Sequence, residues 1–254
     1  MAVYAFDFDG VLFDTARECL AVAFATAKAT PGAARERWGN DPAPPPEVAA
    51  AFLQNRGWVG PPWQYGLLLD CIAADRLPAT MAEFLDLAKA RAPEFATFTA
   101  RYFAMRGELS RDVAGWCANM RPYDLALAAF RELHEAGKAV VLSTRDDASI
   151  RLIFRHFAGI SPEILPNGGG GREKWTVLIE AAQRRGLAPQ QVFFLDDYLE
   201  HALPAQRHGI AAHLALWGYT DARASGEARA AGLPCVALPE LEHVLAHFEA
   251  ETVK

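Results

Sequence analysis

Apolar positions divide the chain into parts with two different patterns. At the start, the run Val3 to Phe8 is interrupted only by Asp7 and predicts a buried strand, and residues 15–28 carry apolar side chains at helical spacing. After residue 120, strands are predicted at 139–142, 164–165, 191–195 and 210–216, and helices at 124–136, 148–157, 174–185, 200–208 and 240–249. This alternation predicts an α/β fold, in which a parallel sheet carries helices on both faces.

The middle of the chain has a different pattern. Residues 30–46 contain five prolines and two glycines, which predicts a connection without regular structure. From residue 46 to about 120 every apolar pattern is helical, and no strand is predicted. The sequence therefore predicts an all-helical domain, residues 16–119, inserted into an α/β core made of residues 1–15 and 120–254. Within that core, glycines at 168–171 predict a flexible loop.

Composition narrows the possible partners and location. The 254 residues are 52% hydrophobic and 22% charged, which is ordinary for a globular protein. A formal net charge of -6 argues against a nucleic-acid partner. No apolar stretch is long enough for a membrane helix, and the first residues do not resemble a signal peptide. Four cysteines without a paired motif fit a reducing compartment, so we expect a cytoplasmic protein that contacts no membrane.

Polar side chains follow three of the predicted strands, and one lysine begins a helix. They are Asp7 and Asp9, Ser143 and Thr144, Asp196 and Asp197, and Lys174. Taken singly, each aspartate would be interpreted as a helix cap or a turn residue. Because the carboxyl ends of parallel strands meet at one edge of a sheet, the repetition instead predicts a shared site. Buried like charges need a compensating cation, and carboxylate oxygens favour Mg²⁺.

Four segments resemble, in order and spacing, the motifs of the haloacid dehalogenase-like (HAD) hydrolase superfamily. They are DFDGVLFDT at 7–15, AVVLSTRDD at 139–147, GREKW at 171–175 and FFLDDYLEHALPAQRHGI at 193–210. The resemblance covers residues 1–15 and about 120–220 and leaves the helical insert unmatched. It implies a Rossmann-like core, a helical type 1 cap domain and a phosphatase of the phosphoglycolate-phosphatase kind.

The resemblance also implies roles for individual residues. Asp7 would attack phosphorus and form an aspartyl-phosphate, while Asp9 would protonate the leaving oxygen and later deprotonate water. Ser143 would hydrogen-bond the transferring phosphoryl group, and Lys174 would neutralise charge there. Thr144 and Arg145 are assigned to substrate binding, although a solvated surface position fits Arg145 equally well.

A Mg²⁺ ion is implied by the same motifs. Its expected ligands are Asp7, the backbone carbonyl of Asp9 and the acidic pair of the fourth motif. Register from Gly209 favours Asp197 as the direct ligand, with Asp196 as a second ligand or a holder of water. His201 stands where the family has a further acidic residue, and we expect a structural hydrogen bond from it rather than metal ligation.

The insert and the overall reaction leave alternatives open. Arg56 and Trp58 lie in a segment rich in glycine, proline and tryptophan, and could face a substrate, although packing between helices is slightly favoured. The expected substrate is a small phosphorylated metabolite, and the chain is expected to be a monomer or a homodimer. A phosphomutase of the beta-phosphoglucomutase type shares all core residues, and a non-catalytic binding module is the third alternative. The presence of Asp9 disfavours a dehalogenase or a phosphonate-cleaving enzyme.

Overall fold

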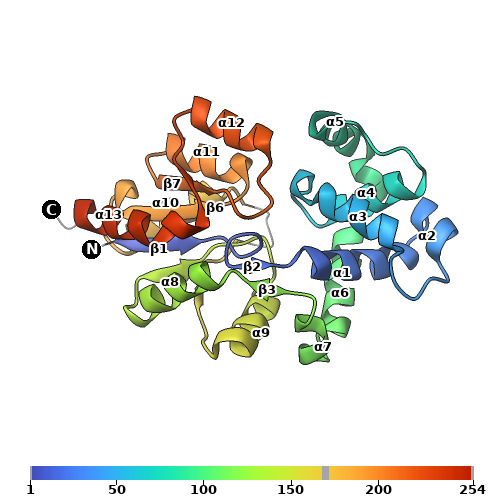
Figure 1. Ribbon diagram of the computed structural model, residues 1–254, viewed down its shortest axis with the longest axis horizontal. Helices are drawn as coiled ribbons and strands as arrows, with labels where there is room; N and C mark the ends of the chain where they lie inside the picture. Colours follow the sequence, from blue (N-terminus) through green and yellow to red (C-terminus); the bar gives the residue numbers. More distant parts are fainter. Residues whose placement is uncertain (1, 168–171, 253–254) are drawn as a thin grey trace. The chain divides into compact units, whose positions relative to one another are not determined.

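The chain divides into two compact units. The computed structural model describes residues 2–167 and 172–252. One unit combines Met1–Asp14 with Arg121–Lys254, and the other is Thr15–Met120 (Figure 1). The predicted glycine loop at 168–171 lies outside the described residues. Within the described part, no helix is both long and apolar enough to cross a bilayer.

A six-stranded parallel sheet forms the centre of the first unit. Its order is β5-β4-β1-β6-β7-β8. The strands are β1 (Val3–Phe6), β4 (Ala139–Val141), β5 (Glu163–Ile164), β6 (Val192–Asp196), β7 (Ala211–Ala215) and β8 (Cys235–Val236). Phe6 is in register with Val141 of β4 and with Leu195 of β6. The three central strands therefore end level with one another, which brings the residues that follow them to the same edge.

Helices cover both faces of this sheet, as the alternation of strands and helices predicts. On one face, α10 (Lys174–Arg184), α11 (Leu199–Arg207) and α12 (Ala222–Ala230) share an apolar core with Ala5 and Phe194. On the other lie α8 (Asp124–Glu135), α9 (Asp147–Ala158) and α13 (Leu241–Thr252) (Figure 1). There the Phe6 ring centroid lies 5.5 Å from that of Phe130 in α8. The predicted fold class is confirmed.

Four strands and α-helices of this unit, within the described residues, were not predicted: β2, β3, β8 and α12. β2 (Phe13–Asp14) pairs antiparallel with β3 (Arg121–Pro122), where the chain leaves and re-enters the unit. β8 and α12 follow the last predicted strand. Two-residue strands carry no periodicity that a sequence pattern could reveal, and α12 is short and rich in alanine, so its apolar face is weak.

The second unit is entirely helical, as predicted. It contains α1 (Ala16–Lys28), α2 (Ala33–Trp38), α3 (Pro46–Gln54), α4 (Trp63–Ala73), α5 (Met81–Arg91), α6 (Phe98–Leu109) and α7 (Val113–Cys117). Two short 3₁₀ helices, Arg56–Trp58 and Ala92–Phe95, connect some of them. Aromatic and leucine side chains from α1, α3, α4, α5 and α6 form its core.

The prediction that residues 30–46 hold no regular element is wrong, because α2 lies within them. The prolines of this segment fall outside the helix, before and after it. Two tertiary contacts stabilise it: the Trp38 ring packs against Phe24 with centroids 5.8 Å apart, and the Ala33 N–H donates to Asp70 Oδ1 at 2.8 Å. Such contacts can stabilise a helix of six residues that would not form alone.

Candidate active site

The predicted strand-end residues gather at the carboxyl edge of the sheet. Asp7 follows β1 directly, Ser143 follows β4 and Asp196 ends β6, while Lys174 is the first residue of α10. β1 lies between β4 and β6, and chain connections leave this centre in both directions, to β5 on one side and to β7 on the other. This is the position in an open parallel sheet where ligands bind.

A lysine buried between two carboxylates forms the centre of the cluster. Lys174 Nζ forms an ion pair with Asp7 Oδ1 at 2.8 Å and donates to Asp196 Oδ2 at 2.8 Å. The Lys174 side chain is 1% exposed and that of Asp196 is 0% exposed. Burial alone would lower the pKa of Lys174, but the two carboxylates outweigh it and raise that pKa. The lysine is therefore a fixed cation.

The two carboxylates respond to this cation differently. Burial raises the pKa of the Asp7 carboxyl to about 6, against the opposing effect of Lys174 and with a further increase from Asp196. For Asp196, burial is outweighed by Lys174 and His201, which hold its pKa below the usual range. Asp196 is thus the ionised counter-ion of Lys174, and Asp7 is an ion held in the folded protein at an energetic cost.

Asp196 is held by three donors. Besides Lys174, the Tyr198 N–H donates to Asp196 Oδ1 at 2.9 Å, and His201 Nδ1 lies 3.2 Å from Oδ2. This contact places His201 on a carboxylate, in the structural role that the sequence favours for it. With these partners, Asp196 fixes the position of the Lys174 ammonium.

Asp197 is enclosed by backbone that the sequence analysis did not identify. The Tyr219 N–H donates to Asp197 Oδ2 at 2.6 Å, and Thr220 Oγ1 donates to the Asp197 carbonyl at 2.6 Å. A Cβ on Gly10 or on Gly218 would overlap the same carboxylate, so glycine is needed at both positions. Gly218 and Tyr219 follow β7. The expectation that functional residues follow the carboxyl ends of the parallel strands therefore applies to them as well.

The arrangement fits a hard divalent cation. Asp7, Asp196 and Asp197 each offer a carboxylate oxygen, and these oxygens all lie within 4.8 Å of one another. All three residues are buried, and no other group of histidine, cysteine or acidic side chains among the described residues comes this close. Burial and repulsion raise the pKa of Asp7, and a bound cation would relieve both effects.

Asp9 points to an arginine. Arg145 Nε lies 3.0 Å from Asp9 Oδ1 and 3.1 Å from Oδ2, and Nη2 lies 2.9 Å from Oδ1. Arg145 is 3% exposed, so the alternative that it is a solvated surface residue is wrong. Its backbone N–H donates to Ser143 Oγ at 3.2 Å, and Asn167 Nδ2 donates to the Ser143 carbonyl at 3.3 Å. Thr144, between Ser143 and Arg145 in the sequence, is half-buried.

Comparison with known proteins decides the family. The model of haloacid dehalogenase-like hydrolases matches residues 1–209, which is most of the chain and includes the carboxylates, Lys174 and Arg145 described above. The chain belongs to the haloacid dehalogenase-like hydrolase family. No curated protein sequence matches it.

Solved structures share the fold of this HAD-like hydrolase at low sequence identity. A haloacid dehalogenase-like hydrolase of Streptococcus pneumoniae is 19% identical, with 98% of each chain covered and a TM-score of 0.62. A protein of Haemophilus somnus, described as a predicted phosphoglycolate phosphatase, is 16% identical, with 96% of this chain and 98% of that chain covered and a TM-score of 0.63. A protein of Thermotoga maritima, described as a candidate beta-phosphoglucomutase, is 16% identical, with 97% and 99% covered and a TM-score of 0.57.

Of the two residues in the insert that were predicted to bind substrate, Arg56 is buried in the helical unit, and Trp58 is partly buried and packs against its core. Arg56 is buried; its Nη1 donates to the Val59 carbonyl at 3.2 Å, and the guanidinium lies 5.0 Å from the Tyr65 ring centroid. The Trp58 ring packs 5.9 Å from that of Phe84. These contacts match the packing alternative, and a role in substrate binding stays a prediction.

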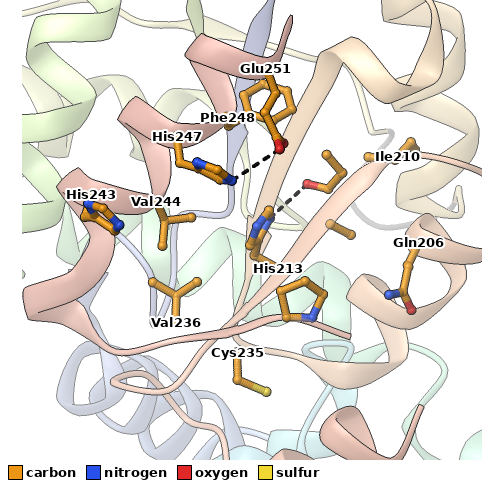
Figure 2. A pocket seen from close by; sticks show the side chains of 13 residues that line it. Gln206, Ile210, His213, Cys235, Val236, His243, Val244, His247, Phe248 and Glu251 are labelled. Atoms are coloured by element: carbon orange, nitrogen blue, oxygen red, sulfur yellow. Dashed lines mark hydrogen bonds and ion pairs between the residues drawn. The ribbon is translucent and has the colours of Figure 1, made fainter. Parts of the chain in front are cut away.

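A cavity of about 440 Å³ in the α/β unit of the hydrolase is separate from the carboxylates. It is lined by the beginning of β7, by β8 and by α13, and Figure 2 shows the imidazoles of His213, His243 and His247 around it. His213 of this lining is in register with Leu195, the residue before Asp196. None of the predicted site residues is among the described residues that line it.

Proposed function

We propose that this protein is a Mg²⁺-dependent phosphomonoester hydrolase that acts on a small phosphorylated metabolite through an aspartyl-phosphate intermediate. The observation that carries the proposal is the buried Asp7–Lys174–Asp196 arrangement, with Asp197 and Asp9 beside it. Membership of the HAD-like hydrolase family supports hydrolytic chemistry. A cluster of this kind is suited to a dianionic substrate, because it offers a fixed cation next to a carboxylate that is costly to ionise.

In the first step, an Asp7 carboxylate oxygen attacks phosphorus, and the bond between phosphorus and the ester oxygen breaks. Asp9 gives its proton to the departing oxygen. Lys174 orients Asp7 at 2.8 Å and neutralises charge where the phosphoryl group arrives. In the second step, Asp9 removes a proton from water as the water attacks phosphorus, and Asp7 is released.

The cation would be held by Asp7, Asp197 and the backbone carbonyl of Asp9, with Asp196 at its side. Asp196 already accepts from Lys174 and from the Tyr198 N–H, which favours Asp197 over Asp196 as the direct ligand. When bound, Mg²⁺ supplies a Lewis acid that neutralises the phosphoryl oxygens. Ser143 and Thr144 would hydrogen-bond the phosphoryl group from the end of β4.

The helical unit is proposed to act as the cap that selects the substrate and excludes water. Arg56 and Trp58 would act there through the packing of this unit, because Arg56 is buried in it and Trp58 packs against its core. A cytoplasmic location and a monomeric or homodimeric state stay predictions of the sequence.

The test is phosphate release from p-nitrophenyl phosphate and from a panel of phosphorylated metabolites, with Mg²⁺ and with chelator. We expect Mg²⁺-dependent release from the wild-type protein that disappears in Asp7→Asn. The matched control is Asp124→Asn, an exposed aspartate in the same unit, and its release should equal that of the wild type. Folded protein that releases no phosphate from any ester would overturn the proposal.

The second candidate function is a phosphomutase, because the mutase and hydrolase reactions use the same Asp7 and Asp9 chemistry. The same panel separates them. A mutase would move the phosphoryl group between positions of a sugar phosphate and release phosphate only slowly.

A further inference from the structure

Arg145 meets Asp9 with two nitrogens at once. Arg145 Nε is 3.0 and 3.1 Å from the two Asp9 oxygens, and Nη2 is 2.9 Å from Oδ1. A planar guanidinium that contacts both oxygens fixes the direction of the carboxylate as well as its distance, which an ammonium point charge does not. The pair therefore sets how the Asp9 carboxylate is oriented.

The arginine is itself held firmly. Its side chain is 0% exposed, whereas that of Asp9 is 16% exposed. The guanidinium lies 5.5 Å from the Phe8 ring centroid, and the Arg145 backbone N–H is bonded to Ser143 Oγ. The next residue, Asp146, caps α9 by accepting from the Ser149 N–H at 2.8 Å. The backbone of Arg145 is thus held by hydrogen bonds on both sides, and its guanidinium contacts a carboxylate that is partly exposed to solvent.

We propose that Arg145 is a positioning residue that aims the Asp9 carboxylate at the leaving oxygen, and is not a ligand of the phosphoryl group. The inference rests on the proposed hydrolase function and deepens it. To bind a phosphate with the same two nitrogens, the buried guanidinium would have to give up Asp9. Arg145 keeps its protons throughout, because an arginine guanidinium is not deprotonated in proteins. The proton moves only between Asp9 and the leaving oxygen, and later between water and Asp9.

Leaving groups of different acidity provide the test. A p-nitrophenolate departs with little need of a proton, whereas an alkoxide requires one from Asp9, so a badly aimed Asp9 harms alkyl phosphates most. General acid catalysis contributes roughly 10² to 10⁴-fold. We expect Arg145→Met to lower kcat about 10²-fold for an alkyl phosphate and less than about 10-fold for p-nitrophenyl phosphate. KM and inhibition by inorganic phosphate should stay within about 3-fold, since no phosphate contact is lost.

Two further variants connect the effect to Asp9. In Asp9→Asn the proton donor is gone, so adding Arg145→Met should cost less than about 3-fold more. Arg145→Lys should recover only part of the lost rate, because lysine cannot contact both oxygens in one plane. The control for an Arg→Met change is Arg155→Met, an exposed arginine on α9, which should leave all rates unchanged.

The outcomes are distinct. A loss of kcat that is the same for every leaving group, with a raised KM and weaker inhibition by phosphate, would show that Arg145 binds the phosphoryl group. That result would overturn this inference but not the proposed function. Additive losses in the double variant would also overturn it. If Arg145→Met does not fold, Arg145→Lys must show the same leaving-group pattern at smaller size, and a uniform loss refutes the inference. A wild-type protein that releases no phosphate would overturn the proposed function, and this assignment with it.

Discussion

Asp7 carries a charge at neutral pH that the folded protein accommodates poorly. Its carboxyl is buried, and its pKa is about 6 compared with 3.8 for an unperturbed aspartate. The folded state therefore binds the Asp7 proton more readily than the unfolded chain between about pH 4 and pH 6, so stability falls as the pH rises through this window. A difference of about 2 pKa units at about 1.4 kcal/mol each gives a full cost of about 3 kcal/mol above that window.

Replacing Asp7 by asparagine removes the charge and keeps the shape. In metal-free buffer we expect Asp7→Asn to match the wild-type free energy of unfolding near pH 4 and to exceed it by about 3 kcal/mol at pH 8. Mg²⁺ should stabilise the wild type more than the variant, since the ion binds a cluster that includes Asp7.

Urea denaturation in chelator, at several values between about pH 4 and pH 8, measures this difference directly. Asp124→Asn is the control for the chemical change, and its exposed position should give no such pH dependence. If Asp7→Asn is no more stable than the wild type at pH 8, or if the difference between them does not change with pH, the account of Asp7 as a costly buried ion is wrong.

Three further expectations concern other parts of the chain. Arg106→Met removes the cation that pairs with Glu18, a carboxylate with 0% of its side chain exposed. It should lower the free energy of unfolding measured in urea by about 3–5 kcal/mol. A loss below about 1 kcal/mol would contradict this. Burial lowers the pKa of His213, so the unfolded chain takes up this proton first and stability falls as the pH drops below about 6.5. His213→Phe should therefore weaken the acid dependence of the melting temperature, and an unchanged slope would contradict the reasoning. Gly10→Ala places a Cβ against the Asp197 carboxylate at a φ of 82° and should weaken Mg²⁺ binding at least 10-fold by calorimetry; unchanged affinity would show that the loop adapts.

The catalytic cluster could be predicted from the sequence because local patterns and one topological rule define it. A buried strand ending in Asp7 and another ending in Asp196 are visible as apolar runs followed by carboxylates. Parallel strands that alternate with helices must place those ends at one edge, so convergence follows without knowledge of any contact. The same reasoning explains why the structure brings Lys174 to the site, since it opens the helix that precedes β6.

Features that depend on long-range contacts could not be predicted. The Arg145–Asp9 pair joins residues 136 positions apart, and no local pattern indicates which carboxylate an arginine after a strand will meet. The α2 helix is stabilised by the packing of Trp38 on Phe24 and by the hydrogen bond from the Ala33 N–H to Asp70, whereas the prolines around it indicate a loop. In both cases tertiary packing decides between conformations that the sequence leaves open.

In the proposed reaction, the phosphoryl group passes through a covalent bond to Asp7. The direct measurement is a single turnover with excess enzyme, stopped in acid, followed by borohydride reduction and peptide mass spectrometry. An acyl phosphate on Asp7 is reduced to homoserine, so we expect homoserine at position 7 in the stopped sample and none in the substrate-free control. Turnover that leaves the Asp7 peptide unmodified at every quench time, or that marks a different residue, would show that the phosphoryl group does not pass through Asp7.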